Sequence, residues 1–255
     1  MKEYKGYLID LDGTIYRGTE VIEEAGDFIS QLRKKGIPYL FVTNNSSRTP
    51  GQVAQKLRDF DIPAKDHQVF TTSMATANFI HEKKSGASVY VIGEEGIRNA
   101  LEEKGFTFEE DNPDFVVMGI DRGITYEKLA AACLAVRKGA FFISTNADIA
   151  LPTERGFLPG NGSLTSVVAV STGIKPTFIG KPESIIVDQA LKVLGTKKEE
   201  TIMVGDYYDT DILAGINSGI DTLLVHTGVT TPELLKNYEV KPTYTVNTLD
   251  LWKFA

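Results

Sequence analysis

Short apolar runs alternate with segments of helical periodicity along almost the whole chain of 255 residues. The apolar runs are rich in Val, Ile, Leu, Phe and Tyr, and Gly, Pro, Asn or Asp bounds them. Strands that alternate with helices build parallel sheets, because a parallel pair needs a long crossover between its strands. The sequence therefore predicts an α/β protein with a doubly wound parallel sheet.

The alternation can be assigned along the chain from apolar spacing and from the flanking Gly and Pro residues. Strands are expected at 7–9, 38–43, 68–71, 88–92, 115–119, 141–145, 177–180, 201–206, 222–226 and 243–246. Helices are expected at 25–32, 50–60, 72–80, 95–104, 125–138, 164–170 and 183–194, and one more passes through Ile216. The Pro- and Gly-rich segment 151–162 is expected to be a loop.

Composition excludes several classes of function. The net charge of −7 and the lack of a Lys/Arg stripe argue against a nucleic-acid partner, which needs a basic face. The single Cys133 excludes an intramolecular disulfide and a cysteine-based metal cluster. There is no stretch of about 18 apolar residues and no signal-peptide pattern. We therefore expect a cytoplasmic protein without a membrane partner.

Two carboxylates follow the first strand directly, in the segment Asp10-Leu11-Asp12-Gly13. Ligands of open α/β sheets bind beyond the carboxyl ends of the strands, so Asp10 and Asp12 are expected at the mouth of a site. Carboxylates held this close repel unless a cation or a shared proton lies between them, which favours a hard cation such as Mg²⁺. A simple turn is the alternative, since Asp and Gly are also favoured there.

Polar side chains follow three further expected strands. They are Thr43, Asn44 and Asn45 after the second strand, Lys181 after strand 177–180, and Asp206 and Asp211 after strand 201–206. In one parallel sheet all these ends open on a single crevice. Carboxylates, a hydroxyl-amide pocket and a lysine suit phosphoryl transfer, which needs a cation, an in-line nucleophile and donors for the phosphate oxygens.

Each residue type has a role in that chemistry. Asp10 can attack phosphorus and form an aspartyl phosphate, and Asp12 can protonate the leaving alcohol and later activate water. Asp206 can hold Mg²⁺ together with Asp10. Thr43 and Lys181 can bind phosphate oxygens together with the amide groups that follow Thr43.

Asp10-Leu-Asp12-Gly13-Thr14, Thr43-Asn44-Asn45, Gly180-Lys181-Pro182 and Gly205-Asp206 through Asp211 resemble, in order, the four motifs of the haloacid dehalogenase superfamily. The long insertion between Thr43 and Lys181 resembles the NagD-like, or p-nitrophenyl-phosphatase-like, branch, which has an α/β cap of type IIA. The resemblance extends into Thr145-Asn146-Ala147-Asp148 and Gly160-Asn161-Gly162 and covers essentially the whole chain.

The resemblance implies a Rossmann-like core of residues 1–83 and 177–255 and an inserted cap of residues 84–176. It implies that Asp10 is the nucleophile and a Mg²⁺ ligand, that Asp12 is the acid/base with its carbonyl on the metal, and that Asp206 is a further ligand. Asp211 would not bind the metal directly but would contact Lys181 or a metal-bound water. Thr43, Asn44, Asn45 and Lys181 would hold the phosphate.

The expected activity is hydrolysis of small phosphate monoesters, such as sugar or acid-sugar phosphates and nucleoside monophosphates. The cap would contact the leaving group, and its candidate contacts are Asn146, Asp148, Glu154, Arg155 and Asn161. The alternatives are a phospho-receiver and a catalytically inactive binding module of similar fold. The oligomeric state is left open, with a homodimer through the cap as one arrangement that such folds adopt.

Overall fold

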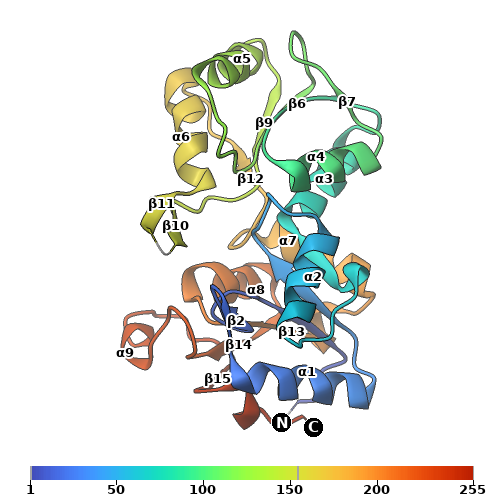
Figure 1. Ribbon diagram of the computed structural model, residues 1–255, viewed down its shortest axis with the longest axis vertical. Helices are drawn as coiled ribbons and strands as arrows, with labels where there is room; N and C mark the ends of the chain where they lie inside the picture. Colours follow the sequence, from blue (N-terminus) through green and yellow to red (C-terminus); the bar gives the residue numbers. More distant parts are fainter. Residues whose placement is uncertain (1, 154, 255) are drawn as a thin grey trace. The chain divides into compact units, whose positions relative to one another are not determined.

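The computed structural model describes residues 2–153 and 155–254, and Figure 1 colours them along the chain. These residues form two compact units. Unit 1 contains the described residues through Thr43, the segment Pro50–Phe70, and the chain from Lys181 onward; unit 2 contains Asn44–Thr49 and Thr71–Gly180. The first unit thus combines the blue beginning of the chain with its orange and red end.

The sheet of unit 1 has the strand order β15-β14-β13-β1-β4-β5 among the described residues. Its strands are β1 (Gly6–Ile9), β4 (Tyr39–Thr43), β5 (Val69–Thr71), β13 (Thr201–Gly205), β14 (Asp221–Val225) and β15 (Tyr244–Val246). The pairings of β1 with β4 and β13, and of β14 with β13 and β15, are parallel. This confirms the parallel sheet that the alternating pattern predicts.

Helices cover both faces of this sheet. The helices of unit 1 are α1 (Glu23–Lys35), α2 (Pro50–Asp59), α7 (Ser184–Leu194), α8 (Leu213–Ser218) and α9 (Pro232–Leu235). Phe28 of α1 and Leu57 of α2 share a core with Ile202. Gly215 of α8 lies against Met203, whose side chain points to the opposite face because side chains alternate along a strand. Strands covered on both sides read as continuous apolar runs.

The order of the strands creates a switch point next to β1. From β1 the chain adds β4 and then β5 on one side, and later adds β13, β14 and β15 on the other. The crevice at such a switch point, beyond the carboxyl ends of the strands, is where α/β sheets bind ligands. The ends of β1 and β13 are therefore the place where a site is expected.

Unit 2 has its own parallel sheet, in the order β12-β9-β8-β6-β7. Its strands are β6 (Ser88–Ile92), β7 (Thr107–Phe108), β8 (Phe115–Met118), β9 (Phe141–Ser144) and β12 (Thr177–Phe178). Its helices are α3 (Thr72–Lys83), α4 (Glu95–Glu103), α5 (Tyr126–Arg137) and α6 (Asn161–Thr172). Helices α5 and α6 lie on one side of this sheet and α3 and α4 on the other (Figure 1).

Two local expectations are wrong. The segment expected to be a loop contains an antiparallel hairpin of β10 (Ala150–Thr153) and β11 (Gly156–Pro159). Its strands are short and mostly exposed, so they carry little apolar periodicity. The strand before Lys181, β12, pairs with β9 in unit 2 and does not extend the sheet of unit 1. The helix expected through Ile216 is confirmed as α8, and a π-helical turn, Tyr208–Ile212, precedes it.

Other short elements were not expected at all. A two-stranded hairpin, β2 (Tyr16–Arg17) and β3 (Glu20–Val21), follows the Asp10–Gly13 turn. Short 3₁₀ segments occupy Asp66–Gln68, Lys198–Glu200 and Leu249–Leu251. The compact units also differ from the predicted domains, because 44–49, 71–83 and 177–180 belong to unit 2. The predicted domain boundaries at 83/84 and 176/177 remain predictions.

Candidate active site

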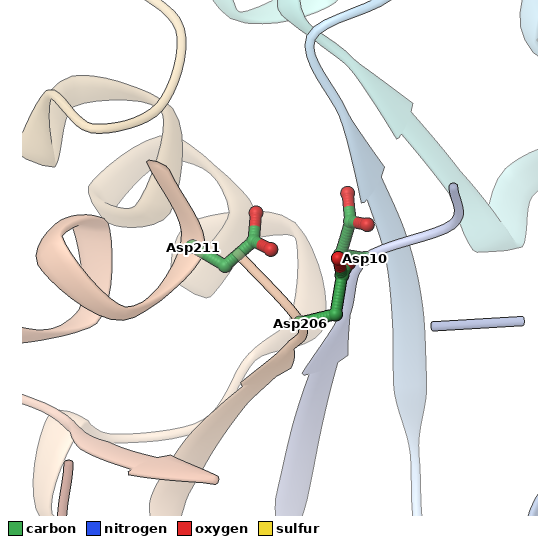
Figure 2. Close-up of side chains that lie close together, drawn as sticks. All are labelled: Asp10, Asp206 and Asp211. Atoms are coloured by element: carbon green, nitrogen blue, oxygen red, sulfur yellow. The ribbon is translucent and has the colours of Figure 1, made fainter. Parts of the chain in front are cut away.

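Three buried carboxylates lie together where β1 and β13 end. Oxygens of Asp10, Asp206 and Asp211 all lie within 4.8 Å of one another. The three residues are 8%, 1% and 1% exposed. Figure 2 shows Asp10 and Asp206 at the ends of neighbouring strands, with the Asp211 side chain pointing toward them from the following turn. We call these three residues the acidic cluster.

The strand register accounts for the position of two members of the acidic cluster. Ile9 lies opposite Val204 in the parallel β1–β13 ladder, and the amide of Asp10 donates to the Val204 carbonyl at 2.9 Å. Asp10 and Asp206 therefore leave the sheet side by side. Burial of unpaired charge is costly, so the packing of the surrounding chain must stabilise this arrangement.

The third member, Asp211, is placed by the π-helical turn. Its carboxylate accepts a hydrogen bond from the amide of Tyr207 at 3.0 Å, and its own amide donates to the Tyr207 carbonyl at 2.8 Å. Single π-helical turns are rare and occur frequently at functional sites. Here the turn brings the Asp211 carboxylate toward the ends of the strands.

Three glycines let the backbone approach the acidic cluster closely. A Cβ atom on Gly13 or Gly228 would lie 2.3 Å or 1.8 Å from Oδ2 of Asp206. A Cβ atom on Gly205 would lie 2.3 Å from Cβ of Asp211. Gly13 also has a φ of 92°, which favours glycine. The backbone thus packs so closely against the carboxylates that a larger residue at these positions would displace them.

Lys181 is the buried cation next to the acidic cluster. Its Nζ forms ion pairs with Asp10 and, at 2.8 Å, with Asp211, and it donates to the Val42 carbonyl at 3.1 Å. The residue is 2% exposed. The sequence predicts that Lys181 ends a strand of the main sheet, but the strand before it, β12, belongs to unit 2, and Lys181 is the residue at which the chain returns to unit 1. It nevertheless lies beside Asp10, as expected.

The electrostatics of the cluster favour a further positive charge. Three carboxylates and one ammonium leave two excess negative charges. Burial, followed by the charge of Asp211, raises the pKa of Asp10 well above its ordinary value and that of Asp206 to about 7. Burial alone would lower the pKa of Lys181, but Asp10 and Asp211 outweigh it and raise that pKa. An all-oxygen donor set with excess negative charge fits a hard divalent cation.

Asp12 has a different environment from Asp10 although the two are separated by one residue. Asp12 is exposed, and its backbone bridges to Tyr16. Partial desolvation by neighbouring atoms raises the pKa of Asp12, while the charge of Lys56 and the amide of Gly18 act against that rise. A carboxyl group that is accessible and has a raised pKa is suited to proton transfer.

The expected phosphate-binding residues fall on both sides of the boundary between the units. Thr43 ends β4 in unit 1, and Asn44 and Asn45 belong to unit 2. The Oδ1 atom of Asn45 accepts hydrogen bonds from the amides of Ser47 and Arg48, each at 3.0 Å. Asn45 therefore stabilises the turn before α2, and its expected contact with phosphate remains a prediction.

The expected cap contacts lie in three different environments. Arg155 is exposed at the β10–β11 hairpin, and Glu154 lies outside the described residues. Asn146 and Asp148 lie in the segment before the hairpin, where Asn146 Nδ2 donates to the Asn44 carbonyl at 2.9 Å. Asn44 Nδ2 lies 3.4 Å and 3.5 Å from the two Asp148 oxygens, which makes a weak contact.

Asn161 has a structural position that the sequence analysis did not anticipate. It is 1% exposed and begins α6, and its Nδ2 lies 2.9 Å from Ser144 Oγ and 3.0 Å from the Asn146 carbonyl. The side chain therefore holds the end of β9 and the segment after it to the start of α6. Its expected contact with substrate remains a prediction.

Sequence reasoning missed the groups that orient Asp206. Thr14 donates its hydroxyl to Asp206 Oδ1 at 3.2 Å, and the amide of Val229 donates to Asp206 Oδ2 at 2.7 Å. A backbone amide carries no residue-type signal, so Val229 could not be selected from the sequence. Thr14 belongs to the first of the four motifs, Asp10-Leu-Asp12-Gly13-Thr14, and that motif is the signal that points to it.

Comparisons with known proteins agree with this arrangement. Residues 7–107 match the family described as haloacid dehalogenase-like hydrolase, and residues 178–251 match the family described as HAD-hydrolase-like. The chain is 68% identical over 252 residues to the 5'-nucleotidase YutF of Bacillus subtilis, with 99% of this chain and 98% of that protein covered. It belongs to the haloacid dehalogenase superfamily.

Two further sets of relatives place the chain within the superfamily. An acid sugar phosphatase of Staphylococcus haemolyticus is 57% identical over 98% of this chain and 96% of its own. The crystal structure of a thermostable NPPase mutant from Geobacillus stearothermophilus matches with a TM-score of 0.95 at 62% identity, and NagD from Escherichia coli K-12 with 0.94 at 31%, each over the full length of both chains. The chain is thus a phosphatase of the NagD-like branch.

None of the helices among the described residues is long and apolar enough to cross a membrane.

Proposed function

We propose that this phosphatase is a Mg²⁺-dependent phosphomonoesterase that hydrolyses small phosphorylated metabolites through an aspartyl phosphate on Asp10. The observation that carries the proposal is the buried Asp10 at the switch point, paired with Lys181 and clustered with Asp206 and Asp211. A carboxylate, a cation and an oxygen-ligand cluster at one point are the groups that phosphoryl transfer needs.

The two chemical steps divide between Asp10 and Asp12. An Asp10 oxygen attacks phosphorus while the bond from phosphorus to the leaving oxygen breaks, and Asp12 gives its proton to that oxygen. Water then attacks phosphorus of the aspartyl phosphate while Asp12 takes a proton of the water. The bond from phosphorus to the Asp10 oxygen breaks, which releases inorganic phosphate and restores the Asp10 carboxylate. The raised pKa of Asp12 supports this role, because an acid/base group works best with a pKa nearer to the operating pH.

The remaining groups stabilise charge on the phosphate. Lys181 and Thr43 would hold phosphate oxygens with Asn44 and Asn45, and Asp211 would keep Lys181 in place. Asp10, Asp206 and the backbone carbonyl of Asp12 would hold Mg²⁺, which offsets negative charge on the phosphoryl oxygens when it is bound. The oxygen donors of the acidic cluster, which lie within 4.8 Å of one another, support this assignment.

We propose nucleoside monophosphates and acid-sugar or sugar phosphates as substrates. The names of the relatives support this choice, since one is a 5'-nucleotidase and others are acid sugar phosphatases. The inserted domain of residues 84–176 would select among them. Asn146, Asp148, Arg155 and Asn161 are its proposed contacts, and Arg155 is suited to a carboxylate or a second anion on the substrate.

The test is release of inorganic phosphate from a panel of these esters, with Mg²⁺ and with a chelator. Release that requires Mg²⁺ is the expected result, and the ranking of the panel gives the substrate class. Release that is unchanged in the chelator would remove the metal from the proposal. A phospho-enzyme that persists would indicate a phospho-receiver, and a protein that neither releases phosphate nor becomes phosphorylated would indicate a binding module.

A further inference from the structure

The segment that follows β14, residues 226–230, contacts Asp206 from a third strand end. We call this segment the β14 loop. The amide of Val229 donates to Oδ2 of Asp206 at 2.7 Å, and the amide of Thr230 donates to the Asp206 carbonyl at 3.1 Å. The Asp206 side chain also packs against Gly228. The β14 loop therefore holds both the carboxylate and the backbone of Asp206.

The same loop also holds the turn that carries Asp12. Thr227 is 6% exposed, and its hydroxyl donates to the carbonyl of Gly13 at 2.7 Å, a contact between residues 214 apart in the sequence. On the far side, Nε of Arg17 in β2 donates to the Thr227 carbonyl at 2.5 Å. Thr227 thus links the turn after β1 to the hairpin β2–β3.

The β14 loop is itself fixed to the protein. Nδ1 of His226 lies 2.8 Å from the Thr230 carbonyl, which closes the loop on itself. The amide of Tyr208 donates to the Thr230 hydroxyl at 2.8 Å, so the loop is also joined to the start of the π-helical turn. A loop restrained at both ends transmits its position to the groups it contacts.

We propose that the β14 loop is a positioning element of the active site and that Thr227 is its central residue. The loop sets the distance between the turn of Asp12 and the carboxylate of Asp206. Thr227 itself does not touch the reacting atoms and acts through Gly13 and through the loop. This inference rests on the proposed function, because Asp12 and Asp206 act together only in a metal-assisted phosphoester hydrolysis.

The size of the effect follows from the behaviour of groups that orient metal ligands. Removing such a partner typically costs 10–100-fold in metal affinity or activity. Thr227→Val keeps the shape of the side chain and removes only the hydroxyl, so the Gly13 carbonyl loses its donor. We therefore expect the kcat of Thr227→Val to fall about 10–100-fold and its Mg²⁺ dissociation constant to rise about tenfold or more.

The experiment compares Thr227→Val with two matched variants. Thr227→Ser restores the hydroxyl and is expected to return kcat and Mg²⁺ affinity to about the wild-type values. Thr222→Val makes the same change at the other end of β14. There the buried hydroxyl accepts a hydrogen bond from the amide of Thr243 at 3.0 Å. Its kcat and Mg²⁺ affinity should stay unchanged although a buried hydrogen bond is also lost.

Mg²⁺ binding is measured by titration calorimetry and kcat and KM by phosphate release at saturating Mg²⁺. Arg17→Met changes an exposed position and is expected to lower Mg²⁺ affinity and kcat, but by less than Thr227→Val does. This variant tests the proposal if Thr227→Val does not fold. The proposal is overturned if Mg²⁺ affinity and kcat are unchanged in the folded Thr227→Val and Arg17→Met variants, or if Thr222→Val lowers both as much as Thr227→Val does.

The two proposals fail in different ways. A wild-type protein that binds Mg²⁺ but releases phosphate from no ester contradicts the proposed function, and calorimetry still tests the β14 loop through Mg²⁺ affinity. An active wild type whose Thr227 variants keep both Mg²⁺ affinity and kcat contradicts the β14 loop alone.

Discussion

The ammonium group of Lys181 lies 2.8 Å from Oδ1 of Asp211, and both side chains are at most 3% exposed. Lys181 also pairs with Asp10, so one buried cation serves two buried carboxylates. Replacing one partner of such a group leaves charge that neither water nor protein compensates. The pair therefore links the proposed chemistry to the stability of unit 1.

Lys181→Met should lower both stability and activity. The thioether side chain fills much of the lysine volume without its charge, and breaking a buried pair typically costs about 3–5 kcal/mol. Urea unfolding measures the loss, and phosphate release measures kcat. Lys5→Met is the control, because its pair with Glu200 is exposed and its loss should have little effect. Equal unfolding free energies for the two variants would contradict the prediction.

Asp10→Asn should abolish turnover while the protein stays folded. The amide cannot form the aspartyl phosphate, and loss of a nucleophile lowers kcat on the order of 10⁴-fold or more. Phosphate release with a substrate from the active panel measures the change, and Asp66→Asn at an exposed position serves as the control. Retention of even a tenth of the wild-type rate would exclude Asp10 as the nucleophile.

Gly228→Ala should weaken Mg²⁺ binding. Its Cβ atom would lie 1.8 Å from Oδ2 of Asp206, so the carboxylate must move. A displaced ligand predicts at least about a tenfold rise in the Mg²⁺ dissociation constant, measured by calorimetry. The control is Gly26→Ala within α1, where the added Cβ would make only an ordinary contact with Ile62. That variant should bind Mg²⁺ normally, and comparable affinities for both variants would refute the steric argument.

The acid stability of unit 2 should depend on Asp114. Its carboxylate accepts hydrogen bonds from Lys84 Nζ at 2.6 Å and from the Ser88 amide at 3.0 Å, and these contacts lower its pKa below 3.8. A carboxyl group whose pKa is lower in the folded state stabilises the fold at pH values above its ordinary pKa. That stabilisation is lost as the pH falls through the pKa of the folded state. Asp114→Asn should thus be less stable than wild type at neutral pH.

The difference between Asp114→Asn and wild type should shrink as the pH falls below about 4. Hydrogen exchange of the β6 and β8 amides across this range measures it, and Asp111→Asn is a control on the same surface segment. A difference that is constant with pH would show that the Asp114 charge does not contribute.

The helices and strands could be predicted from the sequence because each one is marked by residues within its own segment. Buried parallel strands must be continuous apolar runs, and α1 buries the four residues that its spacing predicts, Ala25, Phe28, Ile29 and Leu32, before Gly36 ends it in the left-handed conformation. The polar residues after the strands are local signals as well. Asp10, Asp12, Asp206 and Asp211 could be selected because they follow two strands of one parallel sheet, whose carboxyl ends open on the same crevice.

The tertiary structure decided what depends on pairing between distant segments. The apolar residues before Lys181 could have paired with either sheet, and only the β12–β9 register shows that they join unit 2. The environments of Asp10 and Asp12, which are separated by one residue, differ because Val204 and Lys181 enclose the first and leave the second exposed. Val229 contacts Asp206 through its backbone amide, which every residue type except proline possesses, and the hydroxyl of Thr227 reaches Gly13 across 214 positions of sequence, so no local sequence pattern encodes either contact.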